Sequence, residues 1–217
     1  MSDLSGAYEL SANIPISKNI SVHGILPFSF VDIEYQDTER TLGSVYLGLQ
    51  TRNKSYSRTR TNVSIGIYLP TTSGELWKFN NRLGRLANFN ELEKYRPASM
   101  VLIGVYAIHY YPTNYVKIGA EVGPRLHIPT IDDGRDINFA SVYRVGISYQ
   151  VLGLATFAEL HGSVEIVHYY STNHLNCGIQ INTGAIHPGV LFKYYLDNNF
   201  ENTIDGVLGV YLECLLR

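Results

Sequence analysis

The feature that most constrains the fold is a strict alternation of residue types over residues 115–128, YVKIGAEVGPRLHI. One set of alternate positions is apolar and consists of Val116, Ile118, Ala120, Val122, Leu126 and Ile128. The positions between them are charged, polar or glycine and consist of Lys117, Gly119, Glu121, Gly123, Arg125 and His127. Because successive side chains of a β-strand point to opposite faces, only an extended strand separates these two sets. We therefore predict a strand with one apolar and one polar face.

The same alternation recurs along nearly the whole chain, with few charges among the apolar positions. Together with less regular segments, it predicts eleven strands at about 7–16, 20–34, 44–52, 62–69, 99–111, 115–128, 141–150, 154–166, 175–184, 190–194 and 206–216. Residues 99–111 are apolar on both faces, so the pattern does not orient this strand. The count can change by one if a strand has been split or two have been merged.

Composition helps to decide whether such a sheet faces water or lipid. Charged residues make up 17% of the chain, below the roughly 25% of ordinary soluble domains, yet no apolar run reaches the roughly 18 residues of a membrane-spanning helix. Strands of about ten residues that alternate apolar and polar positions are typical of transmembrane barrels. We predict an all-β fold of one domain over residues 1–217, an antiparallel up-and-down transmembrane β-barrel of about 10–12 strands with a polar lumen and a lipid-facing exterior.

The predicted connections alternate in length, as do the short periplasmic turns and long external loops of bacterial barrels. Short connections are predicted at 17–19, 112–114, 152–153 and 187–189, and longer ones at 36–42, 71–97, 129–137, 168–174 and 197–205; the connection at 52–60 fits the short set only loosely. Single-chain bacterial barrels contain an even number of strands. One hypothesis is that a further strand and a signal peptide lie upstream, because MSDLSG has neither the basic nor the apolar part of an export signal.

Residues 71–97 form the longest predicted loop. Leu76, Phe79, Leu83 and Leu86 recur at three- and four-residue steps, which indicates a short amphipathic helix in an external loop. Such a loop either covers the mouth of the barrel or only caps its rim, and the sequence favours neither.

Tyrosine is unusually frequent, at 17 of 217 residues. Several tyrosines fall near predicted strand ends, where amphipathic rings meet the membrane–water boundary: Tyr110, Tyr111, Tyr115, Tyr149, Tyr169, Tyr170, Tyr194 and Tyr195. The alternative explanation is the ordinary β-propensity of tyrosine. The two cysteines, Cys177 and Cys214, lie on predicted apolar faces and have no metal-ligand spacing.

Charged residues on the polar faces form the candidate site. In a rough antiparallel register Arg144 lies beside Gly123 and His161, with Glu121 and Glu159 on the diagonals, within reach of long side chains. The predicted lumen residues are Lys117, Glu121, Arg125, His127, Arg144, Glu159, His161 and Glu165. They form either a selectivity constriction or a polar plug that fills a narrow barrel; the many inward glycines favour the plug because they leave room for bulky groups.

Other site classes find little support. The seven histidines, at 23, 109, 127, 161, 168, 174 and 187, are too dispersed for a metal site. No cofactor motif is present, and a net charge of -2 without a basic stripe argues against a nucleic-acid partner.

Two short segments, LPTTS at 69–73 and HIPT at 127–130, add to the strand pattern as grounds for a family resemblance. The chain resembles Gram-negative outer-membrane β-barrels over its whole length, and the strand that runs into LPTTSGE is similar to strand ends of the phenol-degradation meta-pathway family of porin-like proteins. The resemblance implies an outer-membrane location, outer-membrane lipid and the barrel-assembly machinery as partners, and passage of small hydrophobic or aromatic molecules. The end Leu215-Leu216-Arg217 departs from the family, whose barrels close on an aromatic residue.

Two alternatives to a passive channel or transporter stay open. The segment HYYSTN at 168–173 resembles the His–Ser–Asn segment of lipid A deacylases, with Ser171, His168 and Glu165 in the roles of nucleophile, base and orienting group. A soluble lipocalin-type barrel is the other, and it would turn the apolar face inward. We predict no enzymatic activity and assign no catalytic residue.

Overall fold

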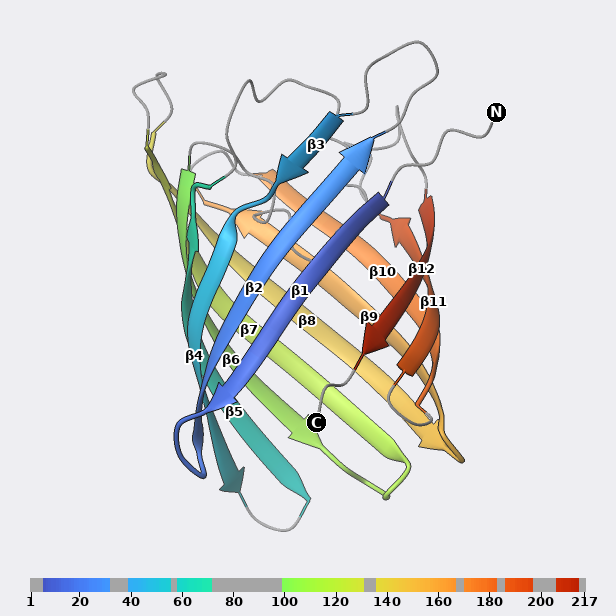
Figure 1. Ribbon diagram of the computed structural model, residues 1–217. Helices are drawn as coiled ribbons and strands as arrows, with labels where there is room; N and C mark the ends of the chain where they lie inside the picture. Colours follow the sequence, from blue (N-terminus) through green and yellow to red (C-terminus); the bar gives the residue numbers. More distant parts are fainter. Residues whose placement is uncertain are drawn as a thin grey trace, which may run out of the picture. The chain divides into compact units, whose positions relative to one another are not determined.

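The computed structural model describes residues 6–31, 39–55, 58–71, 99–130, 136–166, 170–182, 186–196 and 206–214. Over these residues the protein is all-β, and its strands form one antiparallel sheet (Figure 1). The strands are β1 Gly6–Pro15, β2 Ile20–Val31, β3 Glu39–Leu42, β4 Val45–Ser55, β5 Thr59–Leu69, β6 Ser99–Tyr110, β7 Val116–Pro129, β8 Asn138–Val151, β9 Leu154–Glu165, β10 Tyr170–Ile181, β11 Ile186–Tyr195 and β12 Gly206–Cys214.

Eleven strands follow one another in an up-and-down order, β1-β2-β4-β5-β6-β7-β8-β9-β10-β11-β12, and the short β3 pairs with β2 off this path. The eleven predicted strands correspond to the eleven on the path, and β3 is the one that the alternation missed. Its four residues are too few for a period-two pattern to stand out. The sheet is not closed into a barrel over the described residues, since β1 pairs there with β2 and β12 with β11.

The chain divides into two compact units. Unit 1 comprises residues 1–52, 63–104 and 124–139, and unit 2 comprises residues 53–62, 105–123 and 140–217. The residues of β9, β10, β11 and β12 all belong to unit 2, and those of β1, β2 and β3 belong to unit 1.

The apolar face of β7 is the exposed one. Ile118 and Val122 have 43% and 52% of their surface exposed, whereas His127 on the polar face has 3%. The same inversion holds on β8, where Val145 and Ile147 are exposed, and on β10, where Leu175 and Ile179 are exposed while Asn176 is buried. The alternation therefore assigned residues of these strands to faces correctly, and the apolar face is the exposed one.

Strand β6, which the sequence could not orient, has a definite sidedness. Val101 and Ala107 are buried, while Leu102, Tyr106 and Ile108 are exposed. Val101 packs with Ile25, Tyr46 and Tyr68 in the hydrophobic cluster of unit 1. Tertiary packing decides the orientation here because both faces of the strand are equally apolar.

Three predicted connections were wrong. The long connection predicted at 168–174 is short, because residues 170–174 belong to β10 and pair with β9. Residues 187–189 do not form a turn: they lie in β11 and pair with β12, Pro188 opposite Leu212, and the preceding connection falls at 182–185. A proline near the start of a strand is tolerated where no ladder bond needs its missing N–H, so His-Pro-Gly is a weaker turn signal here than it looks. The connection predicted at 52–60 shortens to 56–58 because both flanking strands extend into it.

The predicted helix and loop at 71–97 fall outside the described residues, apart from Thr71 at their start. The Thr71 hydroxyl donates a hydrogen bond to the Gly43 carbonyl at 2.7 Å and accepts one from the Val45 N–H at 3.0 Å. These contacts fix the end of β5 beside the start of β4. In the described ranges, no helix is long and apolar enough to span a bilayer.

Candidate functional site

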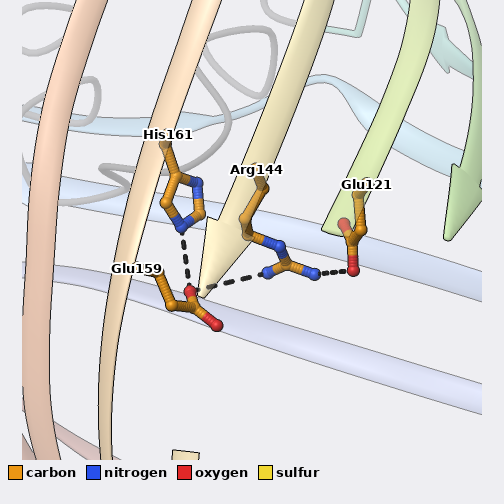
Figure 2. Close-up of polar contacts among 4 residues, drawn as sticks. All are labelled: Glu121, Arg144, Glu159 and His161. Atoms are coloured by element: carbon orange, nitrogen blue, oxygen red, sulfur yellow. Dashed lines mark hydrogen bonds and ion pairs between the residues drawn. The ribbon is translucent and has the colours of Figure 1, made fainter. Parts of the chain in front are cut away.

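Four of the predicted lumen residues meet on the polar faces of three consecutive strands (Figure 2). Arg144 of β8 forms an ion pair with Glu121 of β7 through its Nη2 atom, and its Nη1 atom lies 3.8 Å from Glu159 Oε2 of β9. The same Glu159 oxygen lies 2.9 Å from His161 Nε2. We call these residues, Glu121, Arg144, Glu159 and His161, the Arg144 cluster.

The register of the strands brings this cluster together. Arg144 lies directly opposite His161, and Gly146 directly opposite Glu159. A Cβ atom at Gly146 would stand 2.6 Å from Glu159 Cγ, so the missing side chain leaves the space that the Glu159 stem occupies. The prediction that Arg144 pairs with His161, with Glu159 on the diagonal, is confirmed.

The cluster is a fixed charge network. One guanidinium contacts two carboxylates, and the imidazole of His161 contacts one of them, with all four side chains at least half covered. Guanidinium groups suit such sites because their donors are rigidly arranged. Removal of the guanidinium leaves Glu121 and Glu159 as neighbouring like charges, so Arg144 is the central member of the network.

A second polar group lies on the same face of β9, β10 and β11. The His161 and His174 rings stack with centroids 5.1 Å apart, and the Tyr195 ring centroid lies 6.2 Å from that of His174. Lys193 Nζ lies 4.8 Å from the centre of the Tyr195 ring. Lys193 and Asn176, which are opposite each other in the ladder, have 1% and 0% of their surface exposed.

Sequence analysis missed His174, Asn176, Lys193 and Tyr195 as site residues. The signal was present, since Asn176 and Lys193 fall on polar positions of their strands. The loop predicted at 168–174 and the misplaced turn at 187–189 hid it, because a shifted connection changes every cross-strand partner of a hairpin. Because β10 begins at Tyr170 and β11 at Ile186, His174 lies opposite both His161 and Tyr195.

The other predicted lumen residues are Lys117, Glu165, Arg125 and His127, which are not members of the Arg144 cluster as defined above. Lys117 and Glu165 are each four residues from a cluster member on the same strand, about 13 Å away at the usual rise. Both are partly covered, on the polar faces of β7 and β9. Arg125 and His127 belong to unit 1, where His127 is buried.

The hydrolase constellation is divided between two faces. Ser171 is exposed opposite Val164, which is also exposed, whereas Glu165 is the next residue and points to the other face. His168 lies outside the described residues. Among the residues that the structure describes, no group of three or more histidine, cysteine, aspartate or glutamate side chains is placed to hold a metal ion. Cys177 is a free thiol.

Exposed tyrosines gather where strands end. Tyr110 ends β6, Tyr115 precedes β7 and Tyr149 lies near the end of β8, and all three are exposed. The Tyr115 and Tyr149 rings have centroids 6.5 Å apart. Tyr194 of β11 is exposed as well. Of the other tyrosines that the sequence placed near strand ends, Tyr111 lies beneath the Arg60 guanidinium and Tyr195 faces the polar side. Tyr169 and the side chain of Tyr170 lie outside the described part of the chain.

No protein-family model matches this sequence, and no curated protein matches it.

Proposed function

We propose that the protein is an outer-membrane β-barrel whose polar face encloses a lumen, and that it works as a passive channel for small molecules. The observation that supports this most is the inverted distribution of side chains. Large apolar residues are exposed along one face of successive strands, while Lys193, Asn176 and His161 are buried on the other. Water-soluble proteins rarely expose such continuous apolar surface, whereas hydrocarbon favours it.

Strand length supports the same proposal. The strands on the path contain from 9 residues in β12 to 14 in β7 and β8. A tilted strand needs about 9–11 residues to cross a bilayer, while strands of globular proteins most often have about 5–6. The exposed tyrosines at the ends of β6 and β8 would lie at the membrane boundary, where such rings accumulate.

A barrel requires closure of the sheet. Because β1 and β12 are the first and last of eleven antiparallel strands, they run in the same direction. A ladder between them would therefore be parallel, and one added strand would make every ladder antiparallel. Closure in one of these ways is part of the proposal, since unpaired backbone groups cost several kcal/mol each in hydrocarbon.

The Arg144 cluster is then a lumen site. Its side chains connect neighbouring strands, so the network runs along the wall of β7, β8 and β9. Fixed charges at such a position control which solutes pass. The permeant that the family resemblance implies, a small hydrophobic or aromatic molecule, belongs to the same proposal. The exposed apolar face favours this function over a lipocalin-type barrel, and the separation of Ser171 from Glu165 disfavours the hydrolase.

The direct experiment is conductance across a planar lipid bilayer with the purified protein and its Arg144→Ala variant. We expect the wild type to form ion-conducting pores and the variant to change their conductance or ion preference, because two carboxylates lose their counter-charge. Arg58→Ala is the matched control, since Arg58 is exposed beside the connection between β4 and β5. Identical conductance of the wild type and Arg144→Ala would count against a lumen role for the cluster.

A further inference from the structure

A second constriction candidate lies in unit 1, on the covered face of β2, β4, β5 and β6. Ile25, Tyr46, Tyr68 and Val101 form its hydrophobic cluster, with 6%, 8%, 2% and 0% of their surfaces exposed. Ile103 packs against them. In a barrel whose outer surface is apolar, these covered residues face the lumen. An apolar cluster on that face therefore does not contact lipid.

Tyr46 is the central member of this cluster. Its ring centroid lies 4.8 Å from that of Tyr68 and 5.7 Å from that of His23, which meets it edge-on. A Cβ atom at Gly48 or at Gly66 would collide with the Tyr46 ring. The ring therefore lies over the backbone of β4 and β5, in a seat that only glycine at both positions provides.

We propose that this cluster is an apolar constriction of the lumen and that Tyr46, whose ring lies over Gly48 and Gly66, is the residue that restricts the passage of ions there. The inference rests on the proposed barrel and goes beyond it, because it adds an apolar barrier in unit 1 to the charged Arg144 cluster. Hydrophobic constrictions stop ions by excluding water, since a charge that leaves water without a partner meets a large free-energy cost. Solutes that pass such a constriction readily are small and uncharged.

The test is ion conductance of proteoliposomes and planar bilayers that contain Tyr46 variants. Tyr46→Ala should raise single-channel conductance above that of the wild type, while Tyr46→Phe, which keeps the ring, should leave it unchanged. Because Tyr46→Ala leaves a cavity that destabilises the protein, Tyr46→Val, which removes the ring but keeps a side chain of good strand propensity, provides a second opening variant. Tyr110→Ala is the matched control, because Tyr110 is exposed near the end of β6.

The glycines beneath the Tyr46 ring provide an independent test of the apolar constriction. Gly66→Ala should displace the Tyr46 ring and change conductance in the wild-type background, and it should have no further effect when Tyr46 is already alanine. Gly24→Ala is the matched glycine control, since the nearest atoms to its Cβ would be 3.8 and 3.9 Å away.

Flotation of the protein with liposomes separates the two hypotheses. Failure of the wild type to float with lipid would overturn the proposed barrel. Stable insertion together with identical conductance of the wild type, Tyr46→Ala and Tyr46→Val would overturn the apolar constriction and leave the barrel standing.

Discussion

At the scale of single residues, glycines and one leucine show how local geometry supports the sheet. Leu152 and Gly153 form the two-residue connection between β8 and β9, with φ of 48° and 80°. Two positive φ angles are typical of the type I′ turn, whose twist matches that of the flanking strands. Leu152 is 98% exposed, so its side chain gains nothing from packing. The residue is held in the left-handed region by the hairpin alone.

Replacement of Leu152 by asparagine should stabilise the protein. Asparagine tolerates the left-handed region, and Asn-Gly is a favoured pair for this turn, so we expect a gain of about 0.5–1 kcal/mol in the free energy of unfolding. Urea unfolding in detergent micelles measures it. Leu154→Asn, in the strand that follows, is the control and should give no gain. A loss of stability in Leu152→Asn would contradict the turn assignment.

Gly162 makes a second residue-scale prediction. A Cβ atom there would collide with the Tyr143 ring and come within 2.7 Å of Asn173 Oδ1, and Tyr143 donates a hydrogen bond to that oxygen. Gly162→Ala should therefore lower the free energy of unfolding by about 1–3 kcal/mol, the usual cost of overpacking. Gly24→Ala should change it much less, because its site has ordinary space. Equal effects of the two variants would contradict this prediction, because they would show that the Tyr143 ring moves aside at no energetic cost.

At the scale of elements, the decisive property is which face of each strand meets the surroundings. The alternation predicted the faces of β7, β8 and β10 from sequence because side-chain direction in a strand is a local property. It failed for β6, where both faces are apolar, and it missed β3, which is too short. The turn before β11 was misplaced because His-Pro-Gly is compatible with a strand start as well as with a turn.

Val122 tests whether the exposed face of β7 meets lipid. Val122→Arg should destabilise the protein in lipid bilayers by about 2–4 kcal/mol if the site lies near the midplane, because an arginine on the lipid face loses its hydration. Val122→Leu should be close to neutral. Unfolding by urea in the presence of liposomes measures both. A surface substitution in water usually stays within about 0.5 kcal/mol, so a neutral Val122→Arg would contradict the membrane proposal.

At the scale of the whole molecule, the inverted side-chain distribution determines solubility. Exposed leucine, isoleucine and valine side chains occur on each of the twelve described strands, from Leu10 of β1 to Val210 of β12. Surfaces of this kind associate in water unless lipid or detergent covers them. Edge strands add to this tendency wherever they stay unpaired.

We expect the purified protein to keep its β-sheet circular dichroism in detergent micelles and to aggregate when the detergent is removed. It should return to a dispersed state when liposomes are supplied. Light scattering and circular dichroism across detergent removal measure this directly. A monodisperse, folded protein in plain buffer would support the lipocalin alternative.

The candidate site was predictable only in part. Arg144, Glu121, Glu159 and His161 were recognised as one cluster because the tight turn at 152–153 fixes the β8–β9 register and so places Arg144 opposite His161. Lys117, Arg125, His127 and Glu165 share the polar pattern with them, but the pattern does not show which positions along one face come into contact. The group around His174 and Lys193 depended on the two connections that flank β10, and both were misplaced in the prediction.

By itself the sequence determined that this chain forms long strands with one apolar and one polar face, because the direction of a side chain from an extended backbone depends only on its own position. The tertiary structure decided which charges meet, which way β6 faces and where Tyr46 rests. Those outcomes depend on register, and register is set by connection lengths and by cross-strand packing, such as the Tyr46 ring over Gly48 and Gly66.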